Sequence, residues 1–215
     1  MTKNVADSEQ SQRNKVQEIL KRLYLLWPEP KSELLHKNAF EMLIATILSA
    51  QTTDIIVNKV TPALFAAYPT PQDLANAEPN DVEMLINKVN FHKTKAKNII
   101  GTGKMLVEKF DGEVPNTVAE IMVLPGAARK TANVVIGNMW GKAEGIVVDT
   151  HVRRLSNALG LTTEQDPIKI EKDLMQIVPK DKWIDFSHLL ILYGRYKCTA
   201  RMKTAECPLL TDIFI

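Results

Sequence analysis

Apolar residues recur at intervals of three and four along most of the chain, and this spacing restricts the fold more than any other sequence feature. One such face is formed by Val16, Ile19, Leu20, Leu23 and Leu26. The alternation typical of strands is nearly absent, and 9 glycines in 215 residues are few for a hairpin-rich β protein. The sequence therefore predicts an all-α protein with short connections.

Capping signals divide this pattern into separate helices. Pro28 and Pro30 end the first, and Asn38 followed by Glu41 resembles a capping box at the start of the second. Thr70-Pro71 marks another start. Asp54 is expected to cap the helix that follows it. Further helices are expected over 82–89, 95–110, 118–124, 130–140, 151–159, 168–177 and 183–193.

Two breaks in the helical pattern predict two domains. The first lies at the prolines near residue 30, and the second lies at Gly141–Gly145. A chain that leaves one domain and returns to it gives an inner domain over 34–142. Residues 1–33 and 143–215 then form a second helical domain from both chain ends.

Composition limits the class of protein. Hydrophobic residues make up 45% and charged residues 24%, which excludes wholesale disorder. No apolar stretch is long enough to cross a bilayer, and the polar N-terminus lacks the apolar core of a secretory signal. Cys198 and Cys207 are too few for a disulfide framework. We therefore expect a cytoplasmic protein in a reducing compartment, and a monomer because no heptad pattern is present.

Positive charge is concentrated in two stretches, although the net charge is only +2. Six lysines and a single acid lie between Lys88 and Lys109, and four basic residues without an acid lie between Arg195 and Lys203. These stretches are either solvated helix faces or a phosphate-binding footprint. Charge alone leaves both interpretations open.

The segment over 118–140 carries the strongest chemical signal. Pro125-Gly126 predicts a tight turn between two helices, the second of which begins near Arg129. Backbone N–H groups at a helix N-terminus lack intrahelical partners and can hold a phosphate oxygen. Arg129 and Lys130 stand in that first turn, where the helix dipole favours anions, so an anionic partner is indicated. The alternative is a helix–helix corner with ordinary solvated charges.

Asp149 follows three apolar residues and precedes Thr150-His151, as a helix N-cap does. By itself such a residue is usually structural. A partly buried Asp near a lysine can tune both groups, because a desolvated lysine loses its proton more readily and becomes nucleophilic. Together with Lys130, Asp149 is a candidate for covalent amine catalysis.

Four motifs, at 40–54, 112–135, 147–157 and 189–198, give the chain a resemblance to helix–hairpin–helix DNA glycosylases of the endonuclease III type. They occur in that family's order and cover about residues 15–208. The resemblance implies a bilobal fold, with a six-helix barrel domain and a second helical domain. It further implies double-stranded DNA as the partner, with a damaged base flipped out of the helix.

The resemblance assigns the catalytic roles to Lys130 and Asp149. Lys130 matches the lysine that attacks C1′ and forms an imine with the opened sugar, and Asp149 matches the carboxylate that stabilises positive charge and moves protons. This implies removal of oxidised pyrimidines followed by strand cleavage at the abasic site. Two alternatives remain open: a DNA-binding paralogue with weakened catalysis, and a thymine or uracil mismatch glycosylase.

The resemblance also assigns DNA contacts. Gln51 matches the residue that fills the gap left by the flipped nucleotide, and Phe91 lies where the family places an apolar wedge. The full set of expected DNA contacts is Gln51, Phe91, Gly126, Ala128, Arg129, Thr131 and His151. The hairpin carbonyls of Met122, Leu124 and Ala127 match a site for a monovalent cation. The simpler alternatives are a solvated Gln51, a core Phe91 and a structural His151.

The sequence departs from the family pattern at three places. Many members bind a [4Fe–4S] cluster through C-x6-C-x2-C-x5-C, whereas here eight residues rather than six separate Cys198 from Cys207, and the remaining ligands fall at Leu210 and past Ile215. We expect no cluster and a C-terminal loop held by apolar contacts of Leu209, Leu210, Ile213 and Phe214. Ala128 replaces the second glycine of LPGxG, which costs about 1 kcal/mol if this position needs a positive φ. If the position needs only close approach to a phosphate, the added methyl group instead weakens DNA binding. Asn90-Phe91 replaces a Gly-aliphatic pair.

Overall fold

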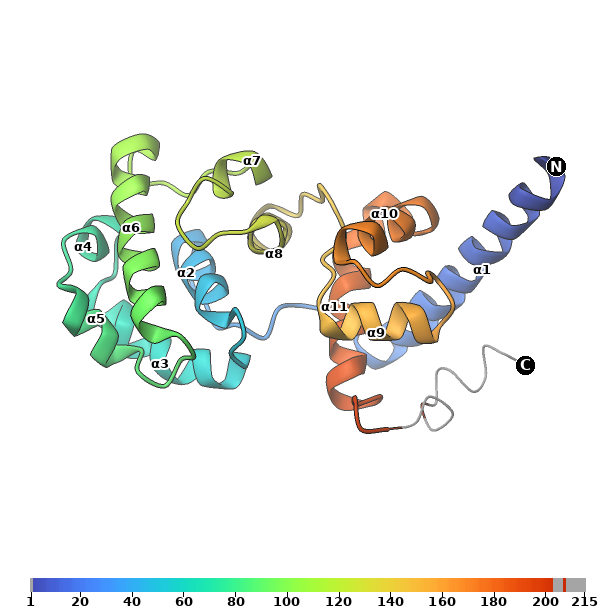
Figure 1. Cartoon of the computed structure of the whole chain (residues 1–215), viewed down its shortest axis with the longest axis horizontal. Helices are drawn as coiled ribbons and strands as arrows, with labels where there is room; N and C mark the ends of the chain where they lie inside the picture. Colours follow the sequence, from blue (N-terminus) through green and yellow to red (C-terminus); the bar gives the residue numbers. More distant parts are fainter. Residues whose placement is uncertain (1, 203–206, 208–215) are drawn as a thin grey trace. The chain divides into compact units, whose positions relative to one another are not determined.

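The computed structural model describes residues 2–202 and residue 207, and every regular element in this part of the chain is a helix (Figure 1). The prediction of an all-α protein is therefore confirmed. Among the described helices, none combines the length and the apolarity that a membrane crossing requires.

The chain divides into two compact units. One comprises Ser32–Lys142, and the other combines Met1–Lys31 with Ala143–Ile215. The sequence predicted the boundaries at 33/34 and 142/143. The first predicted boundary lies two residues after the one in the structure, and the second coincides with it. Each unit has a hydrophobic core of its own.

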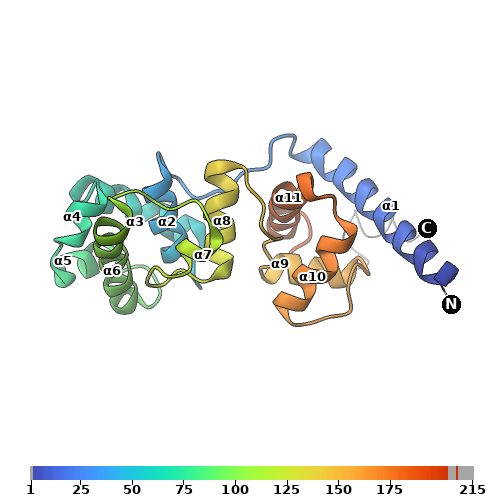
Figure 2. The same ribbon diagram turned by 90° about the horizontal axis from the view of Figure 1, so that it is seen from above.

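The inner unit is built around α2, in which all residues from Phe40 to Leu48 are buried. Helix α2 lies between α6 and α8 in both ribbon views (Figures 1 and 2). Such a helix, apolar on all sides, is stable only as the centre of a bundle. The helices of this unit are α2 (Ala39–Ser49), α3 (Asp54–Ala67), α4 (Pro71–Ala75), α5 (Pro79–Leu85), α6 (His92–Phe110), α7 (Val118–Ile121) and α8 (Arg129–Trp140).

The predicted caps of the inner unit are found with one exception. Asn38 Oδ1 accepts a hydrogen bond from Glu41 N at 2.9 Å, and Thr70 forms a capping box with Asp73. Asp54 was predicted to cap α3, and this is wrong: Thr53 is the N-cap and Asp54 is the first helical residue. The helix predicted over 82–89 begins earlier, at Pro79, because proline fits the first turn of a helix.

The terminal unit contains α1 (Thr2–Leu26), α9 (Thr150–Ala158), α10 (Pro167–Ile177), the short 3-10 helix η1 (Lys180–Lys182) and α11 (Trp183–Tyr196). Helix α11 packs against α9 and α1, and its fully buried Phe186 and Tyr193 fill the centre of this unit. Asp149 and Asp166 are the N-caps of α9 and α10, and their side chains accept backbone hydrogen bonds.

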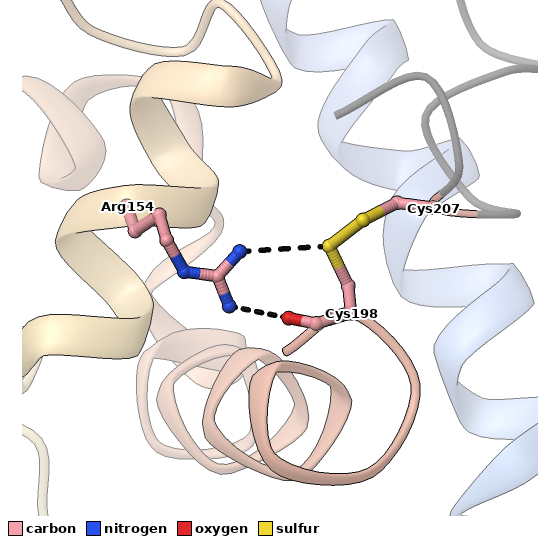
Figure 3. Close-up of a disulfide and its surroundings, with 3 residues drawn as sticks. All are labelled: Arg154, Cys198 and Cys207. Atoms are coloured by element: carbon pink, nitrogen blue, oxygen red, sulfur yellow. Dashed lines mark hydrogen bonds between the residues drawn. A yellow bond between two sulfur atoms is a disulfide. The ribbon is translucent and has the colours of Figure 1, made fainter. Parts of the chain in front are cut away.

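A disulfide joins Cys198, just after α11, to Cys207 (Figure 3). The guanidinium of Arg154, on α9, points at this bond: its Nη1 lies 3.5 Å from Cys198 Sγ, and its Nη2 donates to the Cys198 carbonyl. We did not expect this pairing from the sequence. The apolar contacts predicted for Leu209, Leu210, Ile213 and Phe214 lie outside the described residues.

Candidate active site

The hairpin between α7 and α8 is held in place by α6. Gly126 has φ +79°, and a Cβ at this position would lie 2.9 Å from Nδ2 of Asn98 on α6. Thr102, also on α6, donates a hydrogen bond from Oγ1 to the Pro125 carbonyl at 2.9 Å. The turn therefore requires glycine at 126 for two reasons, a left-handed backbone and a lack of space.

Ala128 does not carry the strain that its replacement of glycine suggested. Its φ of −89° and ψ of 171° describe extended backbone, which any residue adopts. Ala128 is the N-cap of α8, and its side chain makes no capping hydrogen bond. The condition under which the replacement would cost about 1 kcal/mol, a positive φ at 128, is therefore not met.

Lys130 is the second residue of α8, and its side chain is exposed, as is that of Arg129. No acidic residue lies in the first turn of this helix. The partial positive charge of the N-terminus and two neighbouring cations thus create a site of positive potential beside the hairpin. Activation of Lys130 by burial was a possibility raised by the sequence, and the exposed side chain does not support it.

Asp149 is the N-cap of α9, as predicted. Its Oδ1 accepts hydrogen bonds from the backbone N–H groups of His151 and Val152, both at 2.8 Å. The preceding strand-like segment is fixed to α11, because Val147 N donates to Ser187 Oγ at 3.0 Å. Within the described structure these bonds engage only Oδ1, so the half-buried carboxylate can offer Oδ2 to an incoming group.

His151 is half-buried where α9 meets α11. Its Nδ1 lies so close to Gly194 that a Cβ at 194 would come within 2.6 Å of it. Burial lowers the pKa of His151, while the nearby Asp149 carboxylate acts in the opposite direction. His151 thus packs closely against α11, and its contact with DNA stays a prediction. It also lines a hollow of about 470 Å³ together with Thr150, Arg153, Arg154, Asn157, Gln165 and Ala200.

Gln51 and Phe91 both project from exposed loops of the inner unit. Phe91 is 64% exposed, so the alternative that places it in the core is wrong. Both residues adopt left-handed backbone, with φ 54° at Gln51 and φ 58° at Phe91. Asn90 connects the two loops: its Nδ2 donates to the Gln51 carbonyl at 2.5 Å, and its backbone N donates to Thr52 Oγ1 at 3.2 Å.

Lys95 is a residue that the sequence reasoning assigned incorrectly. It was grouped with the basic stretch over 88–109, but it is only 5% exposed, whereas the other five lysines of that stretch are exposed. A signal was present in the sequence, because Lys95 precedes Ile99 by four residues and so lies on the apolar face of α6. Burial lowers its pKa to about 8.

The ammonium of Lys95 points at the end of α2. It donates to the carbonyls of Leu48 at 2.7 Å and Ala50 at 2.6 Å, and to Thr52 Oγ1 at 3.1 Å. Three acceptors match the three N–H donors of a lysine. This side chain is therefore occupied within the protein and is not a second candidate for the nucleophile.

Two places in the chain are candidates for a cluster or a metal ion. The residues present do not fit a [4Fe–4S] cluster, because the two cysteines of the chain are bonded to each other and offer no thiolate. In the described part of the chain, no three His, Cys, Asp or Glu side chains gather as a metal site. At the hairpin, Leu124 O accepts from Ala127 N at 3.1 Å, and the monovalent cation on the carbonyls of Met122, Leu124 and Ala127 stays a prediction.

Comparison with known proteins defines the class. Residues 44–180 match the model of the HhH-GPD superfamily base excision DNA repair proteins. Endonuclease III of Synechocystis sp. is 48% identical over 93% of this chain and 91% of its own length, and that of Bacillus subtilis is 43% identical over 86% and 85%. The solved structure of a trapped endonuclease III–DNA covalent intermediate matches 93% of this chain and 94% of its own, with 41% identity and a TM-score of 0.87.

The helical fold, the glycine hairpin before Lys130 and these matches define an HhH-GPD base excision DNA repair protein. Within that superfamily the chain belongs to the endonuclease III family. It is accordingly a base-excision DNA glycosylase with AP lyase activity, and DNA is its partner.

Proposed function

We propose that this glycosylase removes oxidised pyrimidines from double-stranded DNA and cleaves the abasic site through an imine on Lys130. The observation that carries the proposal is the position of Lys130. The amine is exposed in the first turn of α8, directly after a hairpin that only glycine at 126 permits. An amine beside a phosphate-binding turn is well placed to reach the sugar of the same nucleotide.

In the proposed reaction the Nζ of Lys130 attacks C1′ of the extruded nucleotide. The bond between C1′ and the base breaks, the base leaves with a proton, and the sugar ring opens as the C1′–N imine forms. The imine acidifies the proton on C2′, and loss of this proton expels the 3′ phosphate. Water then hydrolyses the imine and releases Lys130 for another turnover.

Asp149 is proposed to stabilise the positive charge that develops on the sugar and to accept and return the protons of these steps. Its Oδ1 is held by two backbone N–H groups, which keeps the carboxylate in one orientation. Its Oδ2 is the oxygen that would face the sugar. The helix cap thus fixes the direction of the catalytic carboxylate.

The proposed DNA contacts follow the chemistry of each side chain. The hairpin N–H groups, Arg129 and Thr131 hold a phosphate, and the exposed lysines of the 88–109 stretch add to the positive surface of the inner unit. Gln51 fills the gap left by the flipped nucleotide, because its amide satisfies the vacated base edges. Phe91 stacks against the opposite strand. We place this activity in the cytoplasm with the chromosomal DNA.

We further propose that the protein functions without an iron–sulfur cluster. The support is chemical: four thiolates are needed, and this chain has two cysteines, each bonded to the other. Arg154 and the disulfide hold together α9 and the residues after α11, which is the region that a cluster would otherwise organise.

Borohydride trapping tests the role of Lys130. Reduction during reaction with duplex DNA containing an abasic site should link the protein covalently to DNA, and Lys130→Gln should abolish the adduct. Lys172→Gln, an exposed lysine on α10, is the matched control and should form the adduct normally. Asp149→Asn keeps an N-cap and should fold, but should slow base removal by about a hundredfold or more.

Two results would contradict the proposal. Binding to damaged duplex without cleavage or adduct would favour the alternative of a DNA-binding paralogue. Trapping that persists in Lys130→Gln would assign the nucleophile to another amine.

A further inference from the structure

We infer that Lys95 is a positioning residue that holds the Gln51 and Phe91 loops in the conformation that enters duplex DNA. The inference rests on the proposed function, because it explains how two of the proposed DNA contacts acquire their geometry. Lys95 itself is only 5% exposed, and its ammonium is directed at the end of α2 and away from any contact with DNA.

Lys95 contacts both loops. Its ammonium bonds to Leu48 O, Ala50 O and Thr52 Oγ1, which lie on both sides of Gln51 in the sequence. Its backbone N donates to the Phe91 carbonyl at 3.0 Å, in the first turn of α6. One residue therefore links the end of α2 and the Gln51 loop to the loop that presents Phe91.

Both loops need such support because their backbones are strained. A left-handed conformation costs a residue other than glycine about 1 kcal/mol or more, and the surrounding structure has to maintain it. Gln51 and Phe91 are both exposed, so neither is held by burial of its own side chain. The hydrogen bonds of Asn90 and Lys95 are the described contacts that connect these loops to each other.

The positive charge of Lys95 suits its surroundings. The last carbonyls of α2 carry the negative end of the helix dipole, and an ammonium stabilises them where no N–H group is available. The charge also makes the bonds stronger than those of a neutral donor. An apolar side chain of similar length at 95 would leave the buried Leu48 O and the partly buried Ala50 O without this donor.

Cleavage of two abasic substrates separates positioning from chemistry. Cleavage of an abasic single strand needs the proposed chemistry of Lys130 and Asp149, whereas an abasic duplex also needs the gap to be filled and the opposite strand to be contacted. Lys95→Met should lower the single-turnover rate on duplex by about tenfold or more and leave the rate on single-stranded DNA within about twofold. Lys59→Met, an exposed lysine on α3, is the matched control and should change neither rate.

A double-mutant cycle tests whether Lys95 acts through Gln51. In a Gln51→Ala background, Lys95→Met should cause little further loss on duplex, because the positioned side chain is already absent. If Lys95→Met fails to fold, Asn90→Ala, at an exposed position, removes the bond to the Gln51 carbonyl and should show the same selective loss on duplex.

The results that would overturn the inference differ from those that would overturn the proposed function. Equal losses on both substrates, full additivity with Gln51→Ala, or wild-type rates for both Lys95→Met and Asn90→Ala would each refute positioning by Lys95. A wild-type protein that cleaves neither substrate would instead refute the proposed function, and the inference with it.

Discussion

At the scale of single residues, backbone strain is concentrated where DNA contact is proposed. Among the residues that the structure describes, three other than glycine have positive φ: Gln51, Phe91 and Asp111. Two of them are the proposed gap-filling and wedge residues, and the third ends α6. Strain at an exposed loop persists only when neighbouring contacts enforce it, and here Asn90 and Lys95 supply those contacts.

Substitution of the strained residues by glycine should separate stability from activity. In Gln51→Gly, relief of strain offsets the extra freedom of the unfolded chain, so the free energy of unfolding should change by less than about 1 kcal/mol. Duplex cleavage should nevertheless fall sharply, because the amide is lost. Chemical denaturation and single-turnover cleavage measure the two effects.

Asp111→Gly provides the control, because Asp111 has the same backbone conformation at the C-cap of α6. Its stability should respond as that of Gln51→Gly does, with duplex cleavage unchanged. A loss of stability above about 2 kcal/mol in Gln51→Gly alone would show that the Gln51 side chain is structural.

At the scale of elements, the orientation of Asp149 depends on the close packing of α9 against α11. Gly194 makes this possible, since its missing side chain leaves room for the His151 ring. Because His151 N also donates to Asp149 Oδ1, a displaced His151 shifts the cap that aims the carboxylate. Gly194 is thereby connected through His151 to Asp149, the proposed catalytic carboxylate.

Gly194→Ala should therefore be both less stable and less active. A Cβ at 194 would lie 2.6 Å from His151 Nδ1 and 2.9 Å from His151 Cβ, so the helices have to separate. Overpacking of this kind costs about 1–3 kcal/mol, which thermal or chemical denaturation will measure. Base removal should slow more than DNA binding weakens.

Gly112→Ala is the comparison, because it has φ +78° and open space around the added Cβ. It should lose about 1 kcal/mol from backbone strain alone and keep full activity. Wild-type activity in Gly194→Ala would show that Asp149 is oriented independently of the α9–α11 contact.

At the scale of the whole molecule, each of the two units folds around its own hydrophobic core. The terminal unit joins segments from both chain ends. The disulfide links Cys198 to Cys207, and Arg154 links α9 to Cys198 (Figure 3). A covalent link across nine residues limits the freedom of the unfolded chain. The disulfide and Arg154 can in this way stabilise the residues around Cys198 without an iron–sulfur cluster.

We predict that the protein, purified without reductant, contains no stoichiometric iron and no free thiol after denaturation. Reduction should lower the free energy of unfolding by about 2–3 kcal/mol, the value expected for a short closed loop. Cys198→Ala/Cys207→Ala should be insensitive to reductant. Iron at several atoms per chain, or two free thiols in the unreduced protein, would contradict this.

The sequence determined which residues form helices and which can do chemistry. Apolar spacing predicted the helical class, and polar residues before apolar runs predicted the caps at Asn38, Thr70 and Asp149. These features are local, because a cap or an amphipathic turn depends on neighbours three or four residues away. The departure from the cluster motif was likewise visible in the spacing of two cysteines.

Only the tertiary structure decided how distant segments act on each other. In the sequence, Lys95 is one of six similar lysines. In the structure, its ammonium binds the carbonyls of Leu48 and Ala50, which lie 47 and 45 residues away. Only the structure showed that Ala128 has extended backbone, and only the structure paired Cys198 with Cys207. The physical reason is common to all three: backbone conformation, burial and bond partners at these positions are set by contacts that no local pattern records.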